Sequence, residues 1–525
     1  MSQGGVLQLV IKDEKFDKFF TASDYLRKRL DRIRQKRSQT KGVANIQPTF
    51  TDIEKSHILY LHAVYRPYVA VASEYAHVKA AGDSTAAISL SGGTLQFTFP
   101  VYGHFTSDMA IHARFRPVGS ATATEPTTET PYYRFCALPG VRMFKKVELR
   151  SDNVLIDDYT PDDVIAASKF FVGADSRPAW ERCHGQQDIR EATYFGNGYT
   201  GNLTYSDGLQ TPKLFHDSFD FYIPLQFDHC RDASRAMLND LVANSQRTVT
   251  CELAPMTDII QALVPAVGGL PPPAPGGAAP APLNLTPVPL PFTKLAVEFD
   301  LYVNGLYVNP EIHDIYASRI GFSLTRVHRR QLSPIEHQSG EFLLSQLKFP
   351  TEYYTIGVRS RHLANDFDRW WMMGFPRVRS NESRLVVPAM IWNSTLNICQ
   401  LVCREATEST TLDNRIDTIG VTASGVVIYP KMSAPFYNSY MPIRYDADSM
   451  VVSPSDESAF LVNFCLYPGQ HNPSGYFNLS ANRDMYVSYR LKTDITPGEA
   501  EMVFSASVLN FIVRRGDSIS LRYSL

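Results

Sequence analysis

The chain has 525 residues and a mass of 58.9 kDa. A single hydrophobic core rarely grows beyond ~250–300 residues, so this length predicts two or more domains. Hydrophobic residues make up 44% and aromatic residues 12%, which excludes general disorder, and the net charge of -2 excludes a nucleic-acid binder acting through its overall charge.

The sequence shows no sign of a membrane span or of secretion. No apolar run approaches the ~18 residues of a transmembrane helix, and the beginning of the sequence lacks the basic and apolar regions of a signal peptide. The seven cysteines lie at irregular spacing and are interpreted as buried thiols of a reducing compartment. Without a secretory signal we expect the five Asn-x-Ser/Thr sequons to be incidental: Asn202, Asn284, Asn381, Asn393 and Asn478.

Residues 1–48 form a basic N-terminal arm. Leu26, Leu30 and Ile33 mark the apolar stripe of a short helix. The other positions of this helix are mostly basic, namely Arg27, Lys28, Arg29, Arg32, Arg34, Lys36 and Arg37. The pattern fits a solvated arm that packs one stripe on the body, an amphipathic helix on a membrane or an acidic partner, or a contact to RNA or DNA.

From residue 49 to about 310, apolar residues alternate with polar ones. The clearest run leads from Phe219 through Phe221, Ile223 and Leu225 to Phe227. A period of two is typical of a half-buried β-strand. The same reasoning predicts strands at Leu95–Val101, Gln246–Leu253 and Leu295–Val303.

Residues 263–291 are dominated by Pro, Ala and Gly. By composition alone this segment is an interdomain linker. However, the strand after this segment needs partner strands, and the strand Gln246–Leu253 before it needs a strand that runs back beside it. A long, exposed loop that joins two strands of one sheet fits equally well.

Residues 311–525 hold a second set of strand candidates. They are Lys348–Arg359, Ser383–Trp392, Gly425–Pro430, Ala459–Tyr467, Asp484–Leu491, Glu501–Val513 and Ser518–Tyr523. No fixed-period repeat is visible, so any duplication must be structural only. We predict an all-β fold with two tandem eight-stranded antiparallel sandwiches after the short helical arm.

Two motifs that suggest chemistry are better explained as structure. Gly196 to Gly201 spell GxGxxG, but a loop-like sequence follows where dinucleotide binding requires a helix, so we predict a tight exposed loop. Cys399 and Cys403 lie in a strand-like run, where residues four apart are ~13 Å apart and cannot share one metal ion. We interpret them as core thiols.

Histidines with neighbouring cysteines, and one basic cluster, are further candidates for sites. None of the histidines and neighbouring cysteines has the spacing of a metal site or of a nucleophile with its base, so we expect structural roles for His216, His229 with Cys230, and Cys183 with His184. The basic cluster of Arg326, His328, Arg329 and Arg330 is interpreted as a solvated or interface face rather than an anion site.

The run from Asp366 to Trp371 holds two carboxylates and two adjacent tryptophans. A sugar-binding platform uses such aromatics to stack on a ring face. A buried aromatic plug under a loop, or an anchor between subunits, is the favoured interpretation of Trp370 and Trp371.

Four long segments carry a resemblance to known proteins, namely Leu301–Gln331, Pro350–Val358, Asn472–Ser480 and Ser505–Leu525. They closely resemble the double jelly-roll major capsid proteins of nucleocytoplasmic large DNA viruses, above all the asfarvirus-like ones, the family of the African swine fever virus capsid protein. Weaker similarities run through the first half, including Pro139-Gly140 and Asp157-Asp158-Tyr159. The resemblance is collinear over nearly the whole chain, although this chain is shorter in the spacers of its first half.

The resemblance implies two eight-stranded jelly rolls side by side, with residues 49–310 as the first and 311–525 as the second. The strands at Phe219–Phe227, Gln246–Leu253 and Lys294–Val308 would be the last three of the first jelly roll, so the Pro-rich run would be a loop within it. It further implies a homotrimeric capsomer of pseudo-hexagonal outline, an icosahedral shell around an inner membrane, and no enzymatic activity, cofactor or metal.

The implied location is the virion, after assembly in the host cytoplasm. The implied partners are neighbouring capsomers, minor capsid and penton proteins, with no direct binding of the genome. The arm would lie at the capsid base and contact minor capsid proteins or the inner membrane through Arg27, Lys28, Arg29, Arg32, Arg34 and Arg37. The rival hypotheses are a carbohydrate-binding jelly-roll protein and a cupin-like enzyme, which needs His and carboxylate ligands around a metal.

Overall fold

The structure is a computed structural model. It describes residues 71–81, 87–123, 127, 129–152, 154–186, 192–193, 204–205, 209–210, 212–239, 246–265, 285–308, 313, 322–347, 349–393, 398–449, 451–478, 484–515 and 518–522, together with residue 35. Within these ranges the backbone alone is described for 376–411, 446–449, 514–520 and several residues beside a gap.

The first half of the described chain is built on two antiparallel sheets. One has the order β1 (Val71–Lys79), β17 (Lys294–Val308), β4 (Phe105–Phe115) and β12 (Phe219–Pro224). The other has the order β3 (Gly93–Phe99), β14 (Arg247–Leu253), β7 (Phe144–Ser151) and β8 (Val154–Tyr159). Two short strands, β2 (Ala87–Ser89) and β13 (Met237–Leu238), extend the first sheet.

The second half repeats this arrangement. One sheet has the order β18 (Phe322–Ile335), β28 (Ala500–Arg515), β20 (Pro350–Ser360) and β25 (Ala459–Asn463). The other has the order β19 (Ser339–Leu343), β27 (Met485–Leu491), β23 (Ile416–Ala423) and β24 (Val426–Ser433). The short strands β26 (Phe477–Asn478) and β29 (Ser518–Arg522) pair with β20 and β28.

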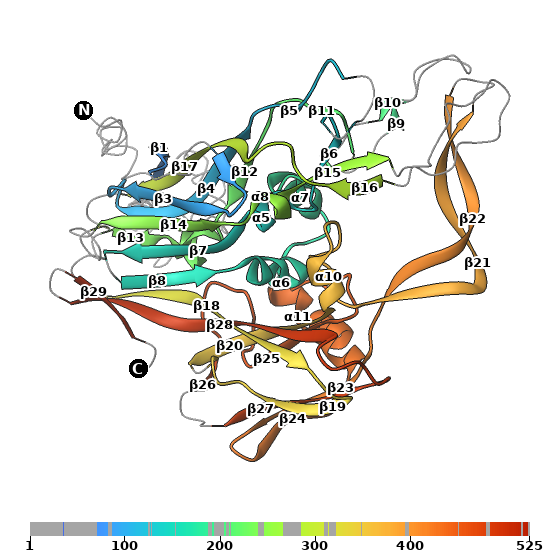
Figure 1. The fold of residues 1–525 in the computed structure, drawn as a ribbon. Coiled ribbons are helices and arrows are strands. Elements are labelled where there is room, and N and C mark those ends of the chain that lie inside the picture. The colour runs from blue at the N-terminus through green and yellow to red at the C-terminus, as the bar shows by residue number, and fades with distance from the viewer. Residues whose placement is uncertain are drawn as a thin grey trace.

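Both halves have the strand order of a jelly roll. Along these sheet paths, the first, eighth, third and sixth strands of each half form one sheet, and the second, seventh, fourth and fifth form the other. The predicted double jelly roll is therefore confirmed, and the duplication is structural, as expected from the lack of a sequence repeat. We refer to the two halves as the first and second jelly rolls (Figure 1).

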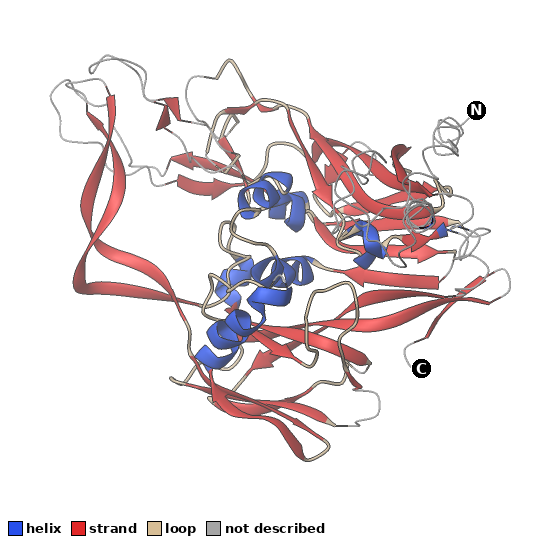
Figure 2. Ribbon diagram, turned by 180° about the vertical axis from the view of Figure 1, so that it is seen from behind, coloured by secondary structure: helices blue, strands red, loops and turns tan. Residues whose placement is uncertain are grey.

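The long insertions lie at one end of both jelly rolls (Figure 1). The first contributes β5 (Val118–Gly119), β6 (Tyr132–Phe135), α5 (Pro139–Arg142), α6 (Pro161–Phe171), α7 (Arg177–Cys183), β9 (Ala192–Thr193), β10 (Thr204–Tyr205), β11 (Phe215–His216), α8 (Met256–Ile259), β15 (Ile260–Pro265) and β16 (Leu285–Val288). The second contributes α10 (Arg361–Asn365), the ribbon of β21 (Phe375–Asn393) and β22 (Ile398–Asp413), the π-helical turn η4 (Phe436–Tyr440) and α11 (Met441–Ser449). Figure 2 shows these helices gathered between the sheets and that ribbon.

Strand β1 begins at the opposite end of the first jelly roll. Strand β17 enters from the insertions at Lys294 and ends at Val308, which pairs with Val71. The connection from β12 to β14 lies at this same end and holds the short turns η1 (Asp228–Cys230) and η2 (Ala233–Arg235). Val71, the first residue of β1, therefore lies at the end that is opposite to the described long insertions.

Each jelly roll has its own hydrophobic core. In the first, the inward residues of both sheets are buried, as Phe97, Val249 and Val297 show with no exposed surface. In the second, Ile356, Val421 and Val487 likewise have no exposed surface. The first core continues into residues of the second jelly roll, among them Trp370 and Met373, so apolar contact also joins the two halves.

The predicted strands are confirmed, with shifted ends. Phe221 and Ile223 are buried while Asp220 and Tyr222 are exposed, but β12 ends at Pro224 because the chain then turns into η1. The prediction was wrong for Val101, which follows the end of β3 and is 39% exposed. The strands of the ribbon extend well beyond Ser383–Trp392.

Other predictions lie outside the described residues. They concern Arg27, Lys28, Arg29, Arg32, Arg34 and Arg37 of the arm, the motif from Gly196 to Gly201, the boundary at 310–311 and the central part of the Pro-rich segment. Strands β15 and β16, which flank that segment, pair with each other in one sheet. That the segment is a loop within the first jelly roll stays a prediction.

Candidate functional site

The two jelly rolls meet where β8 and α6 of the first cover the outer face of the β18–β28–β20–β25 sheet of the second (Figure 1). Side chains alternate along β18, so that Val327 enters the core while Arg326, His328 and Arg330 point outward. With Arg359 of β20 they form what we call the arginine face. We call β8 and the start of α6 the acidic edge, after Asp157, Asp158, Asp162 and Asp163.

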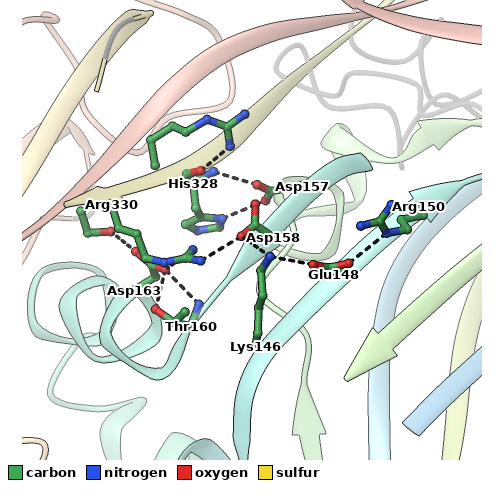
Figure 3. Close-up of polar contacts among 11 residues, drawn as sticks. Lys146, Glu148, Arg150, Asp157, Asp158, Thr160, Asp163, His328 and Arg330 are labelled. Atoms are coloured by element: carbon green, nitrogen blue, oxygen red, sulfur yellow. Dashed lines mark hydrogen bonds and ion pairs between the residues drawn. The ribbon is translucent and has the colours of Figure 1, made fainter. Parts of the chain in front are cut away.

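Strand β8 places Asp157 and Asp158 against β18 (Figure 3). The Asp157 carboxylate accepts the backbone N–H of His328 and lies 2.8 Å from its Nδ1. Arg330 donates to Asp158 at 3.0 Å. Burial raises the pKa of Asp157, opposed by the His328 imidazole beside it. A buried carboxylate at Asp157 therefore destabilises the fold unless the His328 backbone N–H and imidazole contact it.

The start of α6 adds a second pair of acidic contacts. Thr160 precedes Pro161 and Asp163, a sequence that favours a helix N-terminus, and its N–H donates to the Asp163 carboxylate at 2.9 Å. The same carboxylate accepts from the Ser505 hydroxyl of β28 at 2.6 Å. Arg359 donates to Asp162 at 2.8 Å. The first turn of α6 thus also binds the second jelly roll, through Asp162 and Asp163.

A cluster of buried charges closes the other end of the interface. Arg326 makes a two-pronged contact with Glu352, at 2.6 and 3.1 Å. Asp228 of η1 accepts the backbone N–H of Arg326 and a side-chain bond from Arg235 at 2.8 Å. All four side chains are at most 6% exposed. The cluster supports the interface interpretation of the basic residues and excludes a solvated face for Arg326.

Lys169 and the two tryptophans form the third contact region. The Lys169 ammonium lies 2.7 Å from the Asp456 carboxylate and 4.2 Å from the centre of the Trp371 ring. Trp370 is 5% exposed and donates its indole N–H to the Ala137 carbonyl at 2.7 Å. The expectation of a buried aromatic plug is confirmed for Trp370, and its place between the jelly rolls leaves no free ring face for a sugar.

The histidines and cysteines considered as catalytic or metal sites have structural contacts. His216 and His184 are buried and bond the backbone carbonyls of Tyr133 and Trp180. Burial raises the pKa of the Cys230 thiol and lowers that of His229 to about 4. Among the described residues, no group of three or more His, Cys, Asp or Glu side chains could hold a metal ion.

The expectation of buried thiols is confirmed for Cys136, Cys251 and Cys465 but not for Cys183 and Cys230. All five are free thiols, and the latter two are partly buried. Cys399 and Cys403 lie in β22, where the backbone alone is described, opposite Trp392 and Pro388 of β21. No described helix is long and apolar enough to cross a membrane.

The acidic half of the interface was missed at the sequence level. Asp162 and Asp163 stand in a recognisable helix-start sequence, and Asp157 and Asp158 lie in a segment noted only for its resemblance. Glu352 likewise lies in a segment noted only for its resemblance, whereas Lys169 and Asp228 carry no signal at all, because a charged residue is normally solvated.

No family model matches the chain. In sequence it is similar to the hexon protein p72 of African swine fever virus isolate Tick/Malawi/Lil 20-1/1983 and to the major capsid protein of isolate Pig/Kenya/KEN-50/1950. Each is 23% identical over 654 aligned positions that cover 100% of both chains. These positions outnumber the 525 residues of this chain, so the relatives contain segments that it lacks.

In structure the chain is similar to the Faustovirus major capsid protein, with a TM-score of 0.66, 24% identity and coverage of 96% of this chain and 100% of the other. The PBCV-1 capsid protein gives a TM-score of 0.58 with 15% identity, covering 89% of this chain and 100% of the other. The chain is thus similar to the swine fever proteins over the whole length of each and shares the double jelly-roll fold of large DNA virus capsid proteins.

Removal of the Lys169 ammonium tests the third contact region. Lys169→Met leaves the buried Asp456 carboxylate without its cation, and we expect a loss of about 3–5 kcal/mol in stability. The double variant Lys169→Met with Asp456→Asn removes both charges and should recover part of this loss. Thermal unfolding of the wild type, the single variant and the double variant measures the difference. If the single variant is as stable as the double variant, the Lys169–Asp456 ion pair does not stabilise the fold.

Acidification should destabilise the chain through its buried histidines. Burial lowers the pKa of His184 to about 4, whereas an unfolded histidine titrates near 6.5. Between these two pKa values the unfolded state binds a proton that the folded state does not. The free energy of unfolding is therefore highest above about pH 6.5 and decreases by ~3 kcal/mol as the pH falls toward 4.

The measurement is the melting temperature as a function of pH. His184→Gln should have a smaller loss between about pH 7 and pH 5 than the wild type. His337→Gln, at an exposed position, is the matched control and should keep the wild-type dependence. Equal slopes in all three proteins would contradict the role of His184.

Proposed function

We propose that this chain is the major capsid protein of a nucleocytoplasmic large DNA virus, the subunit from which the icosahedral shell is assembled. The observation that carries the proposal is the combination of full-length similarity to swine fever capsid proteins with the jelly-roll strand order in both halves. The name hexon, carried by two swine fever relatives, supports assembly into capsomers with other copies.

The chain acts by assembly and not by catalysis. Several of its buried polar side chains hold the two jelly rolls together: Asp157 contacts His328, Asp228 accepts the backbone N–H of Arg326, and Lys169 pairs with Asp456. Each chain contributes two similar jelly rolls that are held rigidly together. A trimer therefore contains six similar units, which suits a pseudo-hexagonal outline. Residues 49–310 and 311–525 are the two units, and the Pro-rich loop belongs to the first.

The two ends of the molecule have different roles in this proposal. The end with the long insertions, including the β21–β22 ribbon, faces outward. The end at Val71 faces the interior, and the basic arm that precedes it contacts minor capsid proteins or the inner viral membrane through Arg27, Lys28, Arg29, Arg32, Arg34 and Arg37. Penton proteins and neighbouring capsomers are the lateral partners, and assembly takes place in the host cytoplasm.

The mass of the purified protein tests the capsomer. Light scattering behind a sizing column should give about three times the 58.9 kDa of one chain, and negative-stain images of this species should have a hexagonal outline. A well-folded monomer at all concentrations contradicts the proposed function.

Vesicle binding tests the arm. The full-length protein should bind vesicles containing anionic lipid, since each basic residue near such a surface contributes about 1 kcal/mol, and added salt should weaken the binding. Replacement of Arg27, Lys28, Arg29, Arg32, Arg34 and Arg37 by Gln should abolish binding without changing the oligomeric mass. Neutral vesicles are the control, and equal binding of both proteins to anionic vesicles excludes the membrane as partner of the arm.

A further inference from the structure

One arginine of the first jelly roll lies inside its core. Arg247 is the first residue of β14, and it has no exposed surface. Because side chains alternate along a strand, it lies on the same side of the sheet as Val249 and Cys251, which belong to the core. Arginine is almost never fully buried unless a partner balances its charge. The partners of Arg247 therefore decide what this position can do.

The bonded partners of Arg247 are neutral. Its Nη1 donates to Thr106 Oγ1 at 2.9 Å and to Asn239 Oδ1 at 2.8 Å. The guanidinium also lies over the Phe99 ring, 5.4 Å from its centre. Within the part of the chain that the structure describes, no atom accepts a hydrogen bond from Nε or Nη2, and no carboxylate acts on the guanidinium.

The pKa of Arg247 shows the same lack of a counter-charge. Burial acts to lower the pKa of Arg326 and Arg359 as well, but carboxylates such as Glu352 and Asp162 raise it above its usual value there. At Arg247 burial alone acts, and it lowers the pKa to about 10. The guanidinium is still charged at pH 7, and a buried charge without a counter-charge destabilises the folded state.

The second jelly roll shows that packing does not require this charge. Its seventh strand, β27, corresponds to β14 and begins with Met485, which is 2% exposed in the second core. Arg247 pairs with Ser151 at the end of β7, and Met485 pairs in the same way with Ala423 at the end of β23. An apolar side chain therefore suffices at the corresponding position, and the charge of Arg247 indicates a bound ligand.

A second buried side chain in this region has an unpaired nitrogen atom. His229 of η1 is 5% exposed, and its Nε2 has no hydrogen-bond partner among the described residues. Burial lowers the pKa of His229 to about 4, and the charge of Arg247 acts in the same direction, against that of Asp228. The imidazole is therefore neutral at pH 7. In its Nε2–H tautomer it offers a third donor besides Nε and Nη2 of Arg247.

These donors suit an anion better than a water molecule. A guanidinium can donate hydrogen bonds but cannot accept them. Hydrogen bonds between charged partners are roughly twice as strong as those between neutral ones. A water molecule would accept from Nε or Nη2 but would leave the positive charge unbalanced. A small anion accepts these bonds and also balances the charge.

We propose that Arg247 binds one small inorganic anion, such as chloride, in the core of the first jelly roll at the end where Val71 lies. This inference goes beyond the proposed function and does not depend on it. Asn239, which bonds Arg247, also donates to the backbone carbonyls of Tyr102 and Gly103, at 2.8 and 3.0 Å. By fixing Arg247, the anion therefore stabilises the turn between β3 and β4 at this end.

The melting temperature of the full-length protein as a function of chloride tests the site. Chloride replaces gluconate at constant pH and ionic strength, so that the screening of surface charges stays the same. Because the anion binds the folded state alone, the melting temperature should rise by roughly 1–3 °C for each tenfold increase in chloride above the dissociation constant. A melting temperature that is independent of chloride overturns the inference.

Two variants connect the chloride effect to Arg247. Arg247→Met copies Met485 and should be insensitive to chloride, and in gluconate it should melt at or above the temperature of the wild type because it buries no charge. Arg116→Met, at a side chain 68% exposed in the same jelly roll, is the matched control and should keep the chloride dependence. A chloride dependence that persists in Arg247→Met contradicts the assignment.

Bromide locates the anion in the wild type, whether or not Arg247→Met folds. Crystals grown with bromide in place of chloride should give an anomalous scattering peak beside the Arg247 guanidinium. The absence of this peak, or a water molecule in its place, overturns the inference. A bromide peak without any chloride effect on the melting temperature marks an adventitious ion only and overturns it as well.

Discussion

Neutralisation of the arginine face by the acidic edge is the interaction on which the rest of the structure depends. Arg326, Arg330 and Arg359 stand on one face of a sheet whose other face is a core. Covering them without counter-charges would cost several kcal/mol for each ion. The aspartates of β8 and α6 supply these charges to Arg330 and Arg359 with directed hydrogen bonds, and Glu352 and Asp228 supply them to Arg326, so the two jelly rolls can meet in one orientation.

This fixed orientation has consequences for both ends of the molecule. Because the two jelly rolls lie side by side with their long insertions at the same end, the chain has one elaborate end and one plain end (Figures 1 and 2). Apolar contact alone would tolerate sliding of one sheet over the other. The buried pairs of Asp157 and Lys169 restrict such sliding, since any shift leaves a charge unpaired.

The strands could be predicted from sequence because their signal is local. Alternation along β12 and β17 follows from one solvated and one buried face, which neighbouring residues reveal without knowledge of the partner strand. The resemblance added only that three of these strands are the last three of the first jelly roll, and the order of strands within the sheets came from the structure. The failure at Val101 and the early end of β12 have a common cause, since a turn can interrupt a strand without breaking the apolar pattern.

The sequence by itself determined the all-β class, the two strand-rich halves and the absence of a recognisable catalytic motif, because each depends on composition or on residues close along the chain. Only the tertiary structure decided which charges are buried together: Asp163 meets Ser505, and Trp370 meets Ala137, across hundreds of residues. A carboxylate has the same sequence pattern whether water or an arginine solvates it. The packing of the two jelly rolls determines the partner of the carboxylate, and this packing cannot be read from residues that are close along the chain.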